Sequence, residues 1–148
     1  MKHGLMAAEL FVQGYNCAQA IAVAFCDATG MEKDAAAKMA SSFGGGMGGL
    51  REVCGAVSGM LLVAGMLYGY DTLDDVQKKE HYQRVQELAG AFRERIGSII
   101  CREILENLPT DPNLDPQMDA YYKARPCALM VYAAAEILDA YISEHPLN

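Results

Sequence analysis

The feature that most constrains the fold of this chain is its periodicity, because apolar residues recur every three or four positions along nearly its whole length. That spacing places them on one face of an α-helix, whereas a half-buried β-strand requires strict alternation. No stretch alternates in this way, and no run rich in Val, Ile and Thr is framed by hairpin turns. We therefore predict an all-α fold.

Glycine, proline and capping residues divide the chain into about seven to eight predicted helices. The predicted ranges are 3–13, 17–28, 32–42, 50–69, from the capping residues 71–74 to 96, 99–107, 117–122 and 125–144. A chain of 148 residues can bury one genuine core but is too short for two ordinary domains. We expect a single-domain helical bundle over residues 1–148.

One stretch, residues 53–70, carries no charge and is about as long as a short membrane span. Its glycines suit close packing against other helices, and acidic residues follow from Asp71. We therefore predict a buried central helix and no membrane span. At the N-terminus, Glu9 interrupts the sequence before any long apolar core, so we predict no signal peptide and a cytoplasmic location.

The charge balance argues against nucleic acid as a partner. The chain has 19 acidic and 12 basic residues, a net charge of −7, no Trp and no Lys/Arg run that could neutralise phosphates. Its three histidines, His3, His81 and His145, are far apart in sequence, and we expect them on the surface.

Five cysteines are many for a chain of this size without a secretion signal. In a reducing compartment they favour metal binding, a catalytic thiol or redox chemistry over a static disulfide framework. The alternative is that they pack as small apolar residues. Compact metal motifs such as CxxC, Cys-His zinc-finger spacings and HExxH do not occur.

Four of the cysteines stand in or near the first turn of alternate predicted helices: Cys17, Cys54, Cys101 and Cys127. Alternate helices of an up-and-down bundle point the same way, so these four residues should gather at one end. Apolar residues follow each of them at helical spacing, which predicts that the thiols face inward. Cys26 lies about half a turn out of phase with Cys17, and we predict that it is a bystander.

Helix N-termini favour the thiolate, which attacks disulfides and binds metals. The basic residues close to these cysteines in sequence are Arg51, Arg102, Lys123 and Arg125. They could add positive potential at the thiols; alternatively, Arg102 pairs with Glu106 and the other three are solvated. Two chemistries stay open: thiol–disulfide exchange, and ligation of an iron–sulfur cluster or another thiophilic metal. Four cysteines allow three disulfide connectivities, and the sequence does not choose among them.

The glycine-rich stretch 44–49 fits a GxGxxG string, but a predicted helix precedes it where a nucleotide loop needs a strand, and no GK[ST] ending follows. We predict instead that it forms one wall of a cysteine pocket. Gly45, Gly46 and Gly55 would let the backbone approach closely there, and an open amide could receive a small anion or a sulfur ligand.

The segments that carry the cysteines resemble the redox-active proteins known by the pattern C_GCAxxG_C_C. The matching segments are 16–19 (NCAQ), 43–46 (FGGG), 54–59 (CGAVSG), 101–103 (CRE) and 125–127 (RPC). The pattern's label writes glycine before cysteine, whereas this chain reads Cys54-Gly55-Ala56. The resemblance implies redox activity at the same four cysteines, leaves out Cys26, and attaches no substrate or reaction.

Three readings follow. The first is a redox protein, either a thiol-dependent oxidoreductase or an electron carrier, whose four cysteines form one site for thiol–disulfide exchange or electron transfer, with Cys54 as its most accessible member. The second is a binding protein that ligates an iron–sulfur cluster or another metal through Cys17, Cys54, Cys101 and Cys127. The third is a helical interaction module with packing cysteines. Substrate, redox partner, cofactor and oligomeric state stay open.

Overall fold

The computed structural model describes residues 3–109, 115–118 and 126–147, and these residues form helices but no strand. The all-α prediction is confirmed. The elements are α1 (Gly4–Gln13), α2 (Cys17–Ala24), α3 (Cys26–Thr29), α4 (Lys33–Ala40), a 3₁₀ turn η1 (Ser41–Phe43), α5 (Gly44–Met47), α6 (Gly55–Tyr68), α7 (Asp75–Ile96), α8 (Cys101–Glu106) and α10 (Ala128–Glu144).

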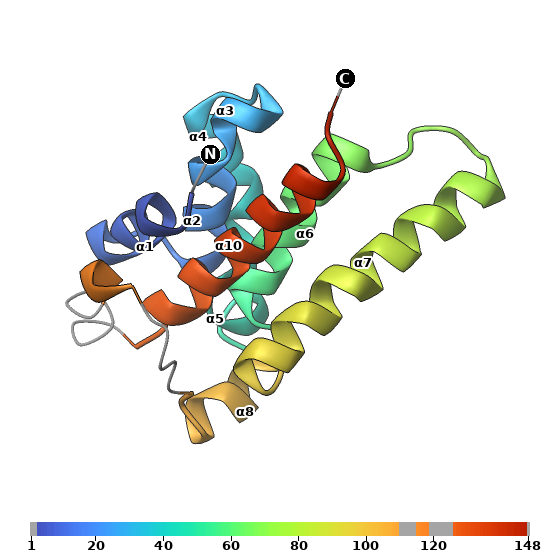
Figure 1. The fold of residues 1–148 in the computed structure, drawn as a ribbon. Coiled ribbons are helices and arrows are strands. Elements are labelled where there is room, and N and C mark those ends of the chain that lie inside the picture. Colours follow the sequence, from blue (N-terminus) through green and yellow to red (C-terminus); the bar gives the residue numbers. More distant parts are fainter. Residues whose placement is uncertain (1–2, 110–114, 119–125, 148) are drawn as a thin grey trace.

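The centre of the molecule is α6, which packs against α2, α7 and α10, while α1 lies along α10 (Figure 1). The close approach of α2 and α6 depends on Gly59, since a Cβ there would lie 2.8 Å from the carbonyl oxygen of Ala18. The buried side chains of these helices form the main core, which includes Phe25, Met60, Leu88, Phe92, Leu129 and Leu138. The prediction of a buried central helix within residues 53–70 is therefore confirmed. None of the helices in the described part of the chain combines the length and apolar character that a bilayer span requires.

Several predicted boundaries are wrong. The helix predicted over 17–28 breaks at Phe25, which separates α2 from α3. The helix predicted from residue 50 begins only at Gly55, because the preceding residues leave a run of left-handed backbone and enter an extended segment. The predicted helix 117–122 lies mostly outside the described residues, and the last helix begins at Ala128 rather than at residue 125.

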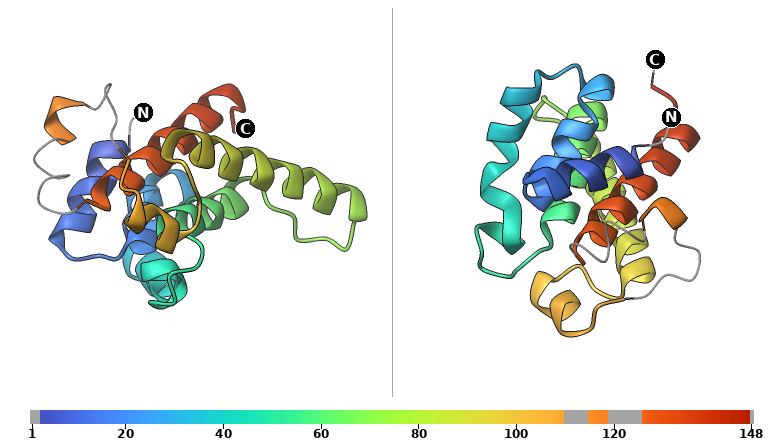
Figure 2. Two further views of the ribbon diagram at one scale, coloured as in Figure 1. Left: turned by 90° about the horizontal axis from the view of Figure 1, so that it is seen from below. Right: turned by 90° about the vertical axis from the view of Figure 1, so that its left-hand side faces the viewer.

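The two halves of α7 differ in their surroundings. Its C-terminal half packs Leu88, Phe92 and Ile96 into the core beside α10. Its N-terminal half, capped by the Asp74 side chain at the N–H of Val76, extends away from the other helices (Figure 1; Figure 2). The helix is therefore packed into the core at its C-terminal end, and near its middle Nε of Arg84 donates to the hydroxyl of Tyr141 on α10 at 3.0 Å.

Candidate functional site

A small cavity lies where α2, α6, α8, α10 and the glycine-rich turn meet. The four cysteines predicted to form one site all line it: Cys17, Cys54, Cys101 and Cys127. Gly45, Gly46 and Gly55, predicted to form its wall, line it as well. Arg51, Ile104, Leu105 and Met130 complete the lining. The fold thus brings together residues that stand up to 110 positions apart, counting from Cys17 to Cys127.

Each of the four cysteines stands at the start of a helix. Cys17 and Cys101 are the first residues of α2 and α8, and Cys54 and Cys127 are the N-caps of α6 and α10. The start of α2 is fixed by Asn16, whose side chain accepts the N–H of Gln19 in a capping box. The four cysteines are therefore brought together by the positions of the helix starts and not by a compact cysteine motif such as CxxC.

An extended pairing holds α6 and α8 in register. Val53 and Ile100 form an antiparallel bridge, the N–H of Cys54 donates to the carbonyl of Ile99 at 2.8 Å, and the N–H of Cys101 donates to Glu52 at 2.6 Å. Because two of the four cysteines lie on these paired segments, the same backbone bonds fix their relative positions.

The glycine-rich turn closes one side of the cavity with left-handed backbone. Positive φ angles run from Gly45 through Gly49, and Gly46 has no room for a side chain. A Cβ on Gly46 would lie 2.7 Å from the Cα of Arg51 and from the Cβ of Cys101. Likewise, a Cβ on Gly55 would lie 3.0 Å from the Cβ of Cys17. Glycine is required because the backbone itself is the wall of the cavity.

Burial raises the pKa values of two of the cavity thiols. Burial and the neighbouring thiol of Cys127 raise the pKa of Cys17 to about 11, although the N–H of Gly45 opposes the shift. Burial and Cys17 raise the pKa of Cys54 to about 12, opposed by the N–H groups of Ala56 and Val57 in the first turn of α6. Both thiols therefore hold their protons at neutral pH.

Cys101 has a cation beside it. Nη1 of Arg51 lies 3.8 Å from Sγ of Cys101 and donates to it. The neighbouring Arg102 does not join this contact; its Nη2 donates to the carbonyl of Leu50 and lies 4.0 Å from a carboxylate oxygen of Glu52. Of the basic residues considered from the sequence, Arg51 thus contacts a cavity thiol, while Lys123 and Arg125 lie outside the described residues.

The prediction that Cys54 is the most accessible of the four is wrong, because its side chain is buried beneath the first turn of α6 and is only 5% exposed. Cys17 and Cys127 are half-buried. Cys26 does not line the cavity; it packs at the edge of a separate small cluster with Ala18, Ala22 and Ala36. No disulfide joins any of the five cysteines, all of which the structure describes.

The prediction of a surface histidine is wrong for His3, which is only 4% exposed. Its Nδ1 lies 2.6 Å from Asp139, its Nε2 lies 2.9 Å from Asp27, and its ring stacks on Phe25 at 4.0 Å. These partners come from distant parts of the sequence, so no local pattern indicates them. The cluster ties the start of α1 to α3 and α10, and lies apart from the cavity lining.

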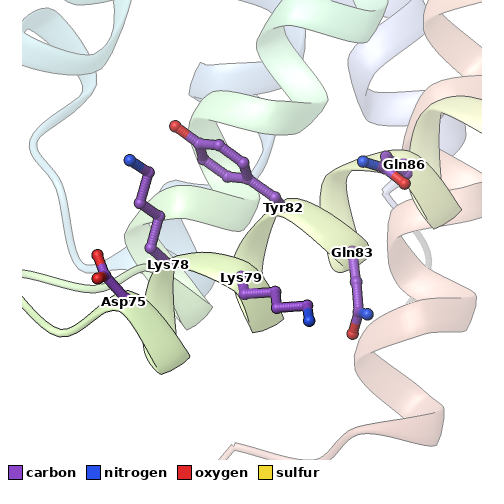
Figure 3. Close-up of a pocket in the computed structure, with 6 residues that line it drawn as sticks. All are labelled: Asp75, Lys78, Lys79, Tyr82, Gln83 and Gln86. Carbon is purple, nitrogen blue, oxygen red and sulfur yellow. The ribbon is translucent and has the colours of Figure 1, made fainter.

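A larger hollow runs along the exposed half of α7. Figure 3 shows its six lining residues on this one helix: Asp75, Lys78, Lys79, Tyr82, Gln83 and Gln86. The ammonium of Lys78 lies 5.7 Å from the centre of the Tyr82 ring. Apart from Tyr82, the side chains are charged or amide-bearing, and the hollow is open to solvent. In contrast to the cysteine cavity, it contains no thiol.

Over the described ranges, no three side chains of His, Cys, Asp or Glu are grouped so as to hold a metal ion. The family model described as "Putative redox-active protein (C_GCAxxG_C_C)" matches residues 15–141, a span that includes all four cavity cysteines. Curated proteins and solved structures give no match to the chain.

Proposed function

Because the chain belongs to the C_GCAxxG_C_C family, described as redox-active, we propose that the four cavity cysteines act together as a thiol redox site. Two of the thiols would lose two electrons and two protons to a disulfide substrate as an S–S bond forms between them. The observation that carries this proposal is the shared cavity, which collects thiols from four separate helices.

The reacting pair includes Cys17 in this proposal. Its thiol interacts electrostatically with those of Cys127 and Cys101, and the thiol of Cys54 interacts in turn with that of Cys17. The thiol of Cys54 also interacts with that of Cys101. Cys17 is thus a neighbour of each of the other three thiols. A disulfide that begins elsewhere in the cavity can pass to Cys17 by exchange, since exchange needs only an attacking sulfur beside the disulfide. We also propose a cytoplasmic location, where a reducing environment would return the thiols to their reduced form.

A thiol count before and after mild oxidation tests the proposal. The reduced protein should show five reactive thiols in denaturant, and the oxidised protein should show three or one, with full recovery after reductant. Cys17→Ser should reduce the oxidation rate at least about tenfold, because the proposed reacting pair loses the thiol that neighbours each of the other three. Cys26→Ser is the matched control and should oxidise like the parent protein. Five thiols after oxidation, or equal rates for the two variants, would contradict the proposal.

A second candidate function is ligation of an iron–sulfur cluster or another thiophilic metal. It is supported by the same convergence of four cysteines, since four thiolates are the usual ligand set of such clusters. The side chains would have to shift to form that ligand set. Anaerobic purification followed by iron and sulfide assays separates the two candidates: stoichiometric iron that is lost in Cys17→Ser but kept in Cys26→Ser would favour the cluster.

A further inference from the structure

We propose that Cys101 supplies the attacking thiolate of this site, that Arg51 stabilises and positions it, and that the substrate is a small, negatively charged disulfide. The proposal deepens the proposed thiol function and rests on it. Its starting observation is the 3.8 Å contact between the Arg51 guanidinium and Sγ of Cys101.

The backbone of Arg51 is held in an unfavourable conformation. Its φ is +62°, a left-handed value that costs a non-glycine residue about 1–2 kcal/mol. Two backbone hydrogen bonds fix it there: the N–H of Arg51 donates to Gly45 at 3.1 Å, and the N–H of Arg102 donates to the Arg51 carbonyl at 3.2 Å. An arginine kept in a glycine conformation, with its guanidinium directed at a thiol, indicates a role for the side chain.

The other cavity thiols are less suited to the first attack. The raised pKa values of Cys17 and Cys54 leave them protonated at neutral pH, and only a thiolate attacks a disulfide efficiently. Cys127 is the competitor, because it is more exposed than Cys101. The ionisable side chains that line the cavity with Cys101 are Cys17, Cys54, Cys127 and Arg51. Arg51 is the cation of this set, and its guanidinium contacts Cys101.

The proposed reaction is a thiol–disulfide exchange in two steps. The Cys101 thiolate attacks one sulfur of R–S–S–R′, so that a bond forms to that sulfur, the S–S bond breaks, and R′–S⁻ leaves and takes a proton from solvent. Cys17 then releases its proton to solvent, and its sulfur attacks Sγ of Cys101 and displaces R–S⁻, which is also protonated. The two cysteines are oxidised to a disulfide, and the substrate is reduced to two thiols.

The cavity itself sets the substrate class. Its volume is about 30 Å³, and Cys101 is only 8% exposed, so a narrow disulfide reaches the sulfur more easily than one embedded in a folded protein. The exposed guanidinium of Arg51 at the cavity favours a substrate that carries carboxylates. Thiol–disulfide exchange at Cys101 should therefore be faster with a small dianionic disulfide than with a cationic disulfide of the same size.

Alkylation of the reduced full-length protein tests the assignment of Cys101. Brief treatment at neutral pH with iodoacetamide, followed by peptide mass spectrometry, should label Cys101 before the other cavity cysteines. Arg51→Gly suits the positive φ and removes the guanidinium, so it should slow labelling of Cys101 by about three- to tenfold. Arg51→Lys should restore part of the rate, and Arg102→Ala, the matched control, should leave it unchanged.

Charged reagents test whether the Arg51 guanidinium favours anionic substrates at Cys101. The ratio of the iodoacetate rate to the iodoacetamide rate at Cys101 should fall by about threefold in Arg51→Gly and stay constant in Arg102→Ala. The reaction should also be faster with dithiodiglycolate, a dianionic disulfide, than with cystamine, a dicationic one. First labelling at Cys127, an unchanged ratio of the iodoacetate and iodoacetamide rates in Arg51→Gly, or equal rates with the two disulfides would overturn the proposal. Early labelling of Cys101 in a protein that never forms a disulfide would contradict the redox function but would support Cys101 as the reactive thiolate.

Discussion

The cysteine cavity and the hollow along α7 differ in almost every physical respect. The cavity measures about 30 Å³ and is built by four helices and a turn, whereas the α7 hollow measures about 470 Å³ and is lined by a single helix. The cavity holds four thiols and a guanidinium, and the hollow holds lysines, glutamines, a tyrosine and an aspartate. The larger of the two spaces thus contains no thiol that could react with a disulfide.

The convergence of side chains from several helices therefore identifies a functional site better than the volume of a cavity does. Side chains from four helices can meet only if the whole fold is formed, so their positions are fixed by the core. Side chains along one exposed helix keep the same spacing whether or not anything binds them. Thiol chemistry should therefore depend on residues that shape the cavity and be indifferent to the exposed half of α7.

The largest expected effect comes from filling the wall of the cavity. Gly46→Ala adds a Cβ 2.7 Å from the Cα of Arg51 at a position where φ is +71°. Strain and overpacking together should lower the free energy of unfolding by about 3–5 kcal/mol. Gly49→Ala is the matched control, because its φ is +84° but its Cβ would meet nothing within 4 Å. It should cost about 1–2 kcal/mol. Urea denaturation measures both, and equal losses would show that the wall is not closely packed.

A smaller effect is expected from alkaline pH. Burial raises the pKa values of Cys17 and Cys54 to about 11 and about 12, while in the unfolded chain both ionise near their ordinary value of 9.0. The unfolded state therefore releases these protons first, and the two thiols' contribution to stability is lost as pH rises above 9.0. Between about pH 8 and pH 10 the free energy of unfolding should fall by about 2–3 kcal/mol.

Urea denaturation at several pH values checks this expectation. Cys17→Ser and Cys54→Ser should each flatten the pH dependence by about half, even where the substitution itself destabilises the protein. Cys26→Ser should flatten it less, since Cys26 lies outside the cavity. Stability that is constant up to about pH 10 would show that the cavity thiols are hydrated.

The smallest effect is expected along α7. Lys79→Ala and Gln83→Ala change exposed side chains of the hollow shown in Figure 3. Each should alter the free energy of unfolding by no more than about 0.5 kcal/mol and leave the rate of cysteine oxidation unchanged. Chemical denaturation and the thiol count measure the two quantities. A slowed oxidation in either variant would link this surface to the thiol site and break the contrast between the two regions.

The sequence predicts the cysteine set because helix starts have local signals. Asn16 with Gln19 forms the capping box that starts α2, and the helix beginning near Cys101 follows a glycine break at Gly97. Once alternate helices are assumed to run in parallel, the four thiols meet without any knowledge of loops. Their roles in chemistry stay a prediction, because position alone does not specify reactivity.

Other features lie beyond sequence patterns. The start of α6 is displaced to Gly55 because five consecutive residues from Gly45 adopt left-handed backbone, a conformation that helical periodicity does not register. His3 is buried because Asp27 and Asp139 meet around it in the folded chain, across separations of 24 and 136 residues. The accessibility of Cys54 depends likewise on how the helices pack. In each case, long-range packing decides the outcome.

The most direct test of a shared thiol site is to map the disulfides that form. The full-length protein is reduced, oxidised briefly with a small disulfide, trapped with acid and digested without reductant, and the linked peptides are identified by mass spectrometry. We expect linked pairs drawn from Cys17, Cys54, Cys101 and Cys127, with Cys17 in the dominant pair and Cys26 alkylated as a thiol. A dominant disulfide that includes Cys26, or links only between separate molecules, would contradict the shared site.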